Sequence, residues 1–183
     1  MDVVGYDVQW PAQFDAYADR VREALGPACL RIDHIGSTSV PGLAAKPVID
    51  MQVSVADVAA PESYRPGLEG AGFLHRPHPE EPERREFFRP PGPRAVHVHV
   101  VEAGGPEERR QLLHRDYLRA HPEVAMEYGA LKQRLARRFR DARQDYQEAK
   151  HPFLQSMGAD AEAWAAATAW SPVTERGCQP PPG

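Results

Sequence analysis

Cysteine is scarce in this sequence, because only Cys29 and Cys178 are present and they lie far apart. Two distant cysteines cannot form the disulfide framework of small secreted domains, so we expect a protein of the reducing cytoplasm. Long apolar runs are also missing, and no segment approaches the length needed to cross a bilayer. The N-terminal stretch MDVVGYDVQWP lacks the basic region and apolar region of a signal peptide.

An excess of positive charge is missing as well, since 22 Lys and Arg residues face 26 Asp and Glu residues, a net charge of -4. We therefore expect neither a membrane partner nor nucleic-acid binding driven by overall charge. The motifs HExxH and GxSxG are absent, and so is the glycine-to-lysine spacing of a Walker loop. These absences argue against the common protease, esterase and P-loop interpretations.

What the chain does have is a globular composition of 183 residues, 42% hydrophobic and 26% charged. We expect one domain over residues 1–170, followed by a flexible tail over 171–183. The pattern mixes strands and helices up to about residue 105 and is helical from residue 106. The sequence therefore predicts an α+β fold, a small mixed sheet flanked by helices with an all-α C-terminal part.

Apolar periodicity places the individual elements. A helix is expected from Pro11 to the stop at Gly26, and another of uncertain length within 56–71. Pro152 predicts a kink or break in the helical half, and the segment 77–93, rich in Pro, Glu and Arg, predicts a functional or mobile loop. Strands are expected at 3–4, 28–35, 48–55, 73–76 and 95–103, with an edge strand at 87–89.

The stretch GSTSVPG places Gly36, Ser37, Thr38 and Ser39 directly after a predicted strand. Gly36 can adopt backbone angles closed to other residues, and the three hydroxyl groups add donors beside free backbone N–H groups. A short helix that starts at Ser37 would direct its N–H groups and its dipole toward an anion such as a phosphate. An ordinary Ser/Thr helix cap is the alternative, and local sequence alone favours it.

Two predicted strands carry polar side chains at a spacing of two residues. Asp50 and Gln52 share one face of the first strand, and His97 and His99 share one face of the second. If the two strands are neighbours, these faces merge into one cluster of oxygen and nitrogen donors that could hold a divalent metal. The alternatives are an Asp50 that pairs with Lys46 or an arginine, and a solvent-facing histidine pair.

The helical half has a basic bias. We expect most of its basic side chains on solvated faces, whereas one or two could close over a phosphate. The residues concerned are Arg115, Arg119, Lys132, Arg134, Arg137, Arg138 and Lys150.

Taken together, several of these stretches resemble one protein family. They are similar to the GrpB family of uncharacterised, predicted nucleotidyltransferases. The stretches that carry the resemblance are the N-terminal VVGYDVQWPAQF, then HIGSTSVPGLAAKPVIDM, HVHVV, HRDYLRAHPEVAMEYGALKQRLA and DYQEAK. The resemblance runs from about residue 3 to about residue 165, nearly the whole expected domain. The long and unusual stretch GSTSVPGLxAKP makes the resemblance specific.

The resemblance implies a fold similar to the polymerase-β-type nucleotidyltransferases. In that superfamily a Gly-Ser pair holds nucleotide phosphates, a strand beyond it carries two carboxylates separated by one residue, and a neighbouring strand carries a third. Carried onto this sequence, Gly36 and Ser37 fall on the Gly-Ser pair and Asp50 on the first carboxylate. The second carboxylate position falls on Gln52, which is a departure from the pattern.

The third carboxylate position falls near His97 or His99, a second departure. One carboxylate, an amide and imidazoles cannot supply the negative charge that two closely spaced metal ions need. A single magnesium ion needs only one or two carboxylates plus substrate phosphates, and imidazole ligands would shift the preference toward manganese, zinc or nickel.

The residues and the resemblance together predict a metal-dependent protein that binds an NTP and could transfer its nucleotidyl group to a small-molecule acceptor. Asp50 would bind the metal, with Gln52, His97 and His99 as further ligands or with a histidine as general base. The nucleotide phosphates would contact Gly36, Ser37, Thr38, Ser39, Lys46, Lys132 and Lys150.

Two alternatives stay open. Gln52 favours a non-catalytic nucleotide- or anion-binding accessory module with a degenerate metal site, and family members resemble the extra domain attached to some dephospho-CoA kinases. The histidine pair is also compatible with a small metal-dependent hydrolase or ligase that runs through an adenylated intermediate. The sequence leaves open the acceptor, the base preference, the metal and the oligomeric state.

Overall fold

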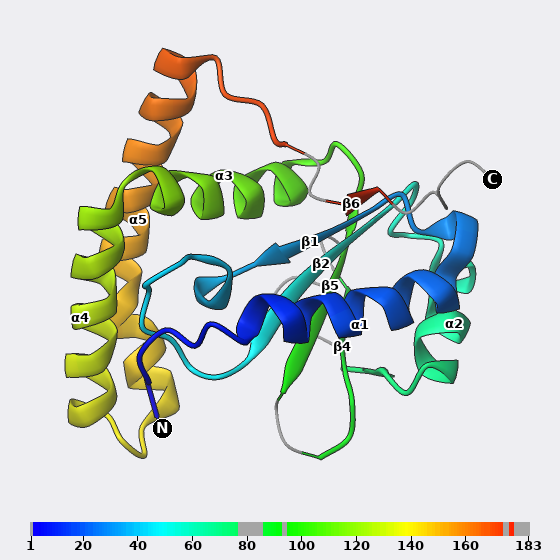
Figure 1. Cartoon of the computed structure of the whole chain (residues 1–183), viewed down its shortest axis with the longest axis horizontal. Helices are drawn as coiled ribbons and strands as arrows, with labels where there is room; N and C mark the ends of the chain where they lie inside the picture. Colours follow the sequence, from blue (N-terminus) through cyan, green and yellow to red (C-terminus); the bar gives the residue numbers. More distant parts are fainter. Residues whose placement is uncertain (1, 77–85, 93–94, 174–175, 178–183) are drawn as a thin grey trace.

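The centre of the fold is a mixed sheet of six strands in the order β3-β4-β5-β2-β1-β6, seen in a computed structural model that describes residues 2–76, 86–92, 95–173 and 176–177 (Figure 1). Among these strands, β2 and β5 pair in parallel, and all other neighbours pair antiparallel. The strands are β1 Arg31–Ile35, β2 Ile49–Val55, β3 Leu74–His75, β4 Glu86–Arg89, β5 Val96–Glu102 and β6 Arg176–Gly177.

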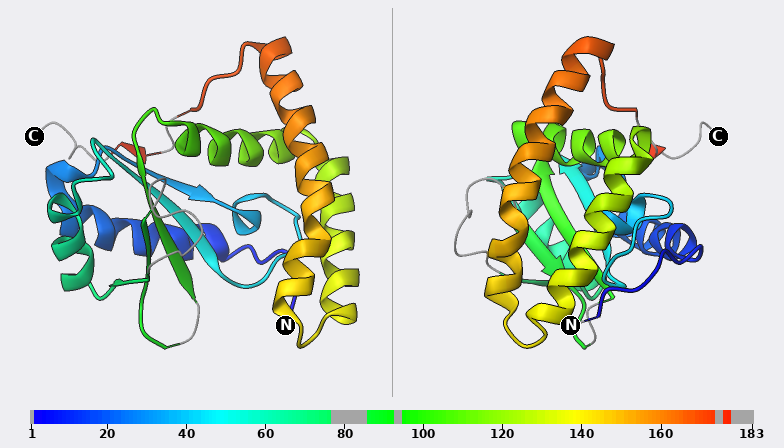
Figure 2. Two further views of the ribbon diagram at one scale, coloured as in Figure 1. Left: turned by 180° about the vertical axis from the view of Figure 1, so that it is seen from behind. Right: turned by 90° about the vertical axis from the view of Figure 1, so that its left-hand side faces the viewer.

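Helices cover both faces of the sheet (Figures 1 and 2). On one face lie α1 (Trp10–Leu25) and the short α2 (Arg65–Gly70). The C-terminal part consists of α3 (Pro106–Ala120), which contacts β1 and β5 from the opposite face, and of α4 (Pro122–Arg138) and α5 (Arg143–Thr168). The last two helices run antiparallel to each other beside one end of the sheet, so the predicted α+β architecture is confirmed.

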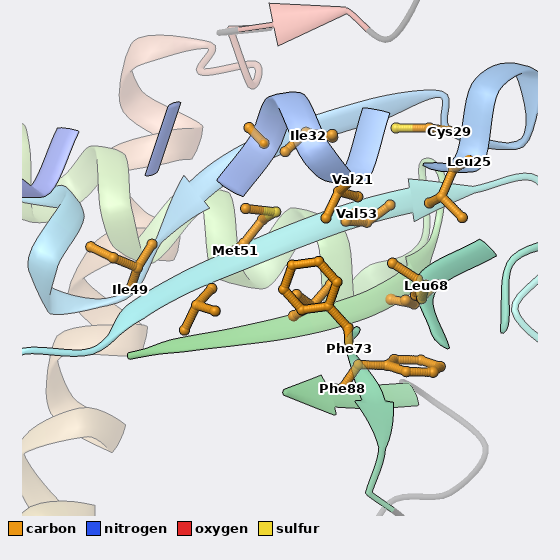
Figure 3. Close-up of a cluster of buried hydrophobic side chains, with 14 of the residues drawn as sticks. Val21, Leu25, Cys29, Ile32, Ile49, Met51, Val53, Leu68, Phe73 and Phe88 are labelled. Atoms are coloured by element: carbon orange, nitrogen blue, oxygen red, sulfur yellow. The ribbon is translucent and has the colours of Figure 1, made fainter. Parts of the chain in front are cut away.

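Two hydrophobic cores hold these layers together. The first lies between the sheet and the helices α1 and α2, where Val21, Met51 and Phe73 meet (Figure 3). The second joins the three C-terminal helices to the loop after β1, through residues such as Leu43 and Leu113. The first core takes up the apolar face of β2 and β5, because burial removes these side chains from water. The opposite, polar face of the two strands therefore lies toward the helical half.

The two central strands present one apolar and one polar face. Met51 of β2 and alternate valines of β5 point into the first core. The alternation of a strand therefore places Asp50, Gln52, His97 and His99 on the other face. The parallel register sets Asp50 beside His97 and Gln52 beside His99, so the two strands are the neighbours that the predicted cluster required.

Three predicted elements need comment. The helix of uncertain length expected within 56–71 is found as the short α2, preceded by a separate 3-10 turn, η3 (Pro61–Ser63), so it does not fill the range. The segment 87–89 is not an edge strand, since β4 pairs with β5 on one side and with β3 on the other. Pro152 lies inside α5, so the predicted break is wrong, while the alternative of a kink stays a prediction.

The C-terminal tail and the Pro-rich loop are described only in part. Residues 176–177 pair with β1 as β6, so this piece of the tail joins the sheet. Most of the 77–93 loop, residues 77–85 and 93–94, lies outside the described residues. The flexibility of the tail and the role of the loop stay predictions.

Cys29 is buried in the first hydrophobic core. The other cysteine of the chain lies outside the described residues. The cytoplasmic location, inferred in part from the cysteines, therefore stays a prediction. In the described part of the chain, no helix has both the length and the apolar character needed to span a membrane.

Candidate functional site

Three side chains that the sequence singled out meet on the polar face of the sheet. Asp50 Oδ1 lies 3.1 Å from His97 Nδ1 and 3.4 Å from His99 Nε2. One ligand atom from each residue can be chosen so that all of them lie within 4.8 Å of one another. A carboxylate oxygen and two imidazole nitrogens at this spacing form a donor set that fits a divalent metal ion.

The environment of Asp50 favours its anionic form. Its side chain is 31% exposed, and burial by itself raises the pKa. Hydrogen bonds and charge from His97 and His99 outweigh burial and hold the pKa of Asp50 well below its usual range. The carboxylate is therefore ionised at neutral pH and can receive a cation without first losing a proton.

Gly36 lies against the same carboxylate. Its φ of +70° is in the left-handed region, and a Cβ at this position would lie 2.6 Å from Asp50 Oδ2. Backbone conformation and close contact each exclude a side chain here. The glycine that the resemblance assigns to phosphates is thus also the residue that lets the loop close around Asp50.

The three hydroxyl groups after Gly36 have different partners. They lie in η2 (Ser37–Ser39), a short 3-10 helix that has no side-chain capping hydrogen bond within the described residues, so the helix-cap interpretation is not supported. Ser37 Oγ accepts a hydrogen bond of 2.7 Å from Lys132 Nζ. Thr38 donates to a backbone carbonyl in the loop before β2, and Ser39 donates to the carbonyl of Gly36.

Three lysines predicted from the sequence approach this loop and the Asp–His group. Lys46 comes from the loop before β2, Lys132 from α4 and Lys150 from α5. The Nζ atoms of Lys46 and Lys150 lie 4.3 Å and 4.8 Å from the centre of the Tyr146 ring. Lys132 Nζ lies 4.4 Å from the centre of the Tyr128 ring. All three ammonium groups therefore rest on aromatic rings of the helical half.

Two of these lysines have lowered pKa values. Burial lowers the pKa of Lys132 to about 7, with a further contribution from the charges of Lys150 and Lys46, while Asp50 acts in the opposite direction. Burial and the charge of Lys46 lower the pKa of Lys150 to about 8, again opposed by Asp50. An anion bound between these lysines would favour their charged forms.

A single pocket of about 370 Å³ joins the sheet, the η2 loop and the two last helices. This volume falls in the range of small-molecule sites. Of the residues predicted from the sequence, Gly36, Ser39 and Gln52 do not line the pocket. The predicted residues that do line it are Ser37, Thr38, Lys46, Asp50, His97, His99, Lys132 and Lys150.

Gln52 lies beneath the pocket, in register with His99. Its side chain is fully buried, and among the described residues neither its oxygen nor its nitrogen has a hydrogen-bond partner. His99 Nδ1 is also buried without a partner in the described part of the chain. Gln52 stands where the superfamily pattern has its second carboxylate, and its neutral amide adds no negative charge there. The role of Gln52 as a metal ligand stays a prediction.

The pocket also contains residues that the sequence did not single out as functional. Tyr128 and Tyr146 had been assigned only to apolar helix positions, yet each stands four residues before a pocket lysine, a spacing that places two side chains on one helix face. This repeated Tyr-x-x-x-Lys pattern was the available signal. For Phe87 the sequence contains no such signal, because this residue reaches the pocket only through the pairing of β4 with β5. The added lining residues are Ala45, Val48, Phe87, Tyr128, Arg143, Tyr146 and Gln147.

Two arginines considered for phosphate contacts have structural partners instead. Arg115 is 3% exposed and donates to Asp33 and Asp116. Arg119 donates two hydrogen bonds to the carbonyl of Ser39 and so attaches α3 to the η2 loop. Neither residue lines the 370 Å³ pocket.

Comparisons with known proteins place the chain in one family. The family model described as GrpB protein matches residues 1–159. The chain belongs to the GrpB family. YqkA, a UPF0157 protein of Bacillus subtilis, is 35% identical to this GrpB-family chain over 164 residues, which are 90% of this chain and 48% of YqkA. A UPF0157 protein of Halalkalibacterium halodurans is 39% identical over 159 residues, 86% of this chain and 80% of that protein.

The family sequence also occurs in a larger protein. A dephospho-CoA kinase of Mycolicibacterium paratuberculosis is 31% identical over 192 residues, which cover 91% of this chain and 47% of the kinase. The chain thus spans about half the length of this relative and of YqkA. The activities of these longer proteins are therefore not assigned to it.

Solved structures confirm the fold. The crystal structure of conserved protein GrpB from Enterococcus faecalis matches with a TM-score of 0.81 and 33% identity, over 89% of this chain and 99% of that chain. A structure of Cid1 in complex with its short product ApU matches with a TM-score of 0.51 and 14% identity, over 74% of this chain and 43% of that chain. Because the identity is so low, the likeness to Cid1 shows a nucleotidyltransferase-like fold alone.

Proposed function

We propose that this GrpB-family protein binds a nucleoside triphosphate together with a divalent metal ion and transfers the nucleotidyl group to a small-molecule acceptor. The observation that carries the proposal is that Asp50, His97 and His99 face the same pocket as three lysines and the η2 loop. A possible metal donor set and a basic surface that would bind phosphates are thus adjacent, as nucleotidyl transfer requires. The likeness in fold to Cid1 supports the proposal only as an analogy.

The metal would be held by the Asp50 carboxylate and the imidazole nitrogens of His97 and His99. When bound, a divalent ion neutralises phosphate charge and makes the phosphorus more open to attack. The imidazoles favour manganese, zinc or nickel, whereas magnesium would depend on the carboxylate and on the phosphates of the nucleotide. The single carboxylate supports one metal rather than two.

The phosphates would lie along the η2 loop and the lysines. Ser37 and Lys132 are already hydrogen-bonded to each other, so an incoming phosphate oxygen meets a hydroxyl and an ammonium at one point. Lys46 and Lys150 extend this surface for the β- and γ-phosphates. An acceptor oxygen would attack the α-phosphorus and pass any proton that it carries to water, the bond from the α-phosphorus to the bridging oxygen would break, and pyrophosphate would leave.

A non-catalytic nucleotide-binding module is the second candidate, and Gln52 is the observation that favours it. The second carboxylate of the superfamily pattern is replaced by a neutral, fully buried amide. Such a site could keep nucleotide affinity while lacking the charge that catalytic members use. In both versions the proposed partners are a nucleotide and small molecules, in a cytoplasmic protein without membrane or nucleic-acid contact.

Calorimetry of ATP binding in the presence of manganese tests the shared part of both candidates. We expect binding to require the metal and the variant Asp50→Asn to lose at least about tenfold in affinity, since even residues that only support metal ligands cost that much. Asp57→Asn is the matched control, because Asp57 follows the same strand and does not line the pocket. Metal-independent binding, or equal affinity in both variants, would refute the site.

Pyrophosphate release separates the catalytic candidate from the accessory module. ATP, CTP, GTP and UTP would be incubated with manganese and a panel of hydroxyl, carboxylate and phosphate acceptors. Release that depends on the acceptor and disappears in Asp50→Asn supports transfer. Clear nucleotide binding without any product across the panel supports the accessory module instead.

A further inference from the structure

The pocket has an excess of positive charge. Four basic side chains line it, Lys46, Lys132, Arg143 and Lys150, against one carboxylate, Asp50. Several like charges around one pocket repel one another, and the lowered lysine pKa values reflect part of this repulsion. A ligand that carries several negative charges along a short chain would relieve it.

The aromatic rings of the pocket are already engaged with other groups. Phe87 packs against His97 and His99, with ring centres 5.0 Å and 5.3 Å apart. Tyr128 is stacked on Phe153, and the ammonium group of Lys132 also lies over its ring. A nucleobase gains affinity and orientation from an open aromatic face, so it would have to displace one of these groups.

The third aromatic ring of the pocket, that of Tyr146, is occupied in the same way. The ammonium groups of Lys46 and Lys150 both lie over its ring. Among the described lining residues, Gln147 is the one side-chain amide that could read the hydrogen-bonding edge of a base, and it is exposed to water. An exposed amide discriminates only weakly between one nucleobase and another, because water can satisfy its donors and acceptors when the base does not.

We infer that the pocket recognises the polyphosphate chain of its ligand and not the nucleobase. This inference rests on the proposed function and adds a specificity that the sequence left open. The phosphates contact a basic surface, whereas among the described lining residues the base finds neither an aromatic ring without a packing partner nor a buried side-chain amide to read it. The four common NTPs are then accepted alike, and inorganic tripolyphosphate occupies the same site.

Competition calorimetry with inorganic tripolyphosphate, ATP, CTP, GTP, UTP and adenosine tests the inference at one fixed manganese concentration. We expect tripolyphosphate and the four NTPs to agree within about fivefold, because stacking of one base is worth at least that much. Adenosine should not bind. The variant Lys150→Gln should weaken all five phosphate ligands by the same factor, about tenfold, through the loss of a charge-assisted hydrogen bond.

Arg134→Gln provides the control, because Arg134 is an exposed basic residue of α4 outside the pocket lining. The variant Arg134→Gln should bind the five phosphate ligands with the same affinities as the wild type. A preference of more than about fivefold for one NTP, or for the NTPs over tripolyphosphate, would overturn the inference and leave the proposed function intact. Failure of every phosphate ligand to bind would overturn both.

Discussion

At the scale of single residues, Gly36 is the most tightly constrained position of the candidate site. The variant Gly36→Ala would combine a φ of +70° with a methyl group 2.6 Å from Asp50 Oδ2. We expect a loss of about 1–3 kcal/mol in the free energy of unfolding from backbone strain alone. Because the Asp50 carboxylate must also move, manganese affinity should fall at least about tenfold, as measured by calorimetry.

Gly42→Ala isolates the contact with Asp50 from the backbone strain. Gly42 has a φ of +79°, but apart from its own chain neighbours no atom of the described residues lies within 4 Å of the position of a Cβ there. This variant should lose similar stability while it binds manganese as the wild type does. Equal manganese affinity in the two variants would show that the contact between Gly36 and Asp50 does not matter for the metal.

Lys132 gives a prediction on pH and stability. The folded protein holds its pKa at about 7, against 10.5 for an ordinary lysine, so between these values the unfolded chain binds more protons than the folded one. Lys132 should therefore make the free energy of unfolding rise with pH in this window, and its own contribution is at most about 1.4 kcal/mol per pH unit. Urea unfolding at several pH values would measure this slope.

Lys132→Met removes that titration and leaves the other groups of the protein in place. The stability difference, wild type minus variant, should increase as the pH is raised through the window above the lowered pKa. A difference that stays constant with pH would mean that Lys132 titrates normally in the folded state.

The same scale shows which site residues the sequence could predict. Asp50, His97 and His99 were found because a spacing of two residues fixes the face of a strand, whatever surrounds it. The role of Ser39 was not predictable, since a hydroxyl in a loop can turn toward a ligand or toward its own backbone. Here it bonds to the carbonyl of Gly36.

At the scale of elements, strong apolar periodicity predicted α1, β2 and β5 well. The same periodicity does not say which strands are neighbours in the sheet. The segment 87–89 was predicted as an edge strand because of its charged, Pro-rich surroundings, yet β4 lies between β3 and β5. Strand order depends on tertiary pairing, which a local pattern does not contain. For the same reason Phe87 was missed as a residue of the pocket.

Pro152 supplies a prediction at this scale. A proline inside a helix lacks the N–H donor and collides with the preceding turn, but α5 continues through this exposed position. Pro152→Ala should therefore stabilise the protein by up to about 3 kcal/mol, seen as a higher melting temperature. Pro122→Ala is the control, because Pro122 lies in the first turn of α4, where proline is tolerated, and should give no gain. A similar gain in both variants would contradict the explanation.

At the scale of the whole molecule, the candidate site exists only where the two halves meet. The sheet contributes Asp50 and the histidines, while α4 and α5 contribute Lys132, Lys150 and the two tyrosines beneath them. The sequence placed these groups in separate segments, and only the docking of the helical half onto the polar face of the sheet brings them together. Residues that fix this docking therefore determine the geometry of the pocket without lining it.

Arg115 is such a residue, and its removal should be costly. It attaches α3 to β1 through a contact of 3.2 Å with Asp33, with both side chains at most 1% exposed. Since removal of one partner leaves a buried charge less well compensated, Arg115→Ala should lower the free energy of unfolding by about 3–5 kcal/mol in urea titrations. Arg109→Ala, on the same helix, breaks an exposed pair with Glu162 and should cost at most about 1 kcal/mol. Equal costs for the two variants would show that the buried pair does not hold the two halves together.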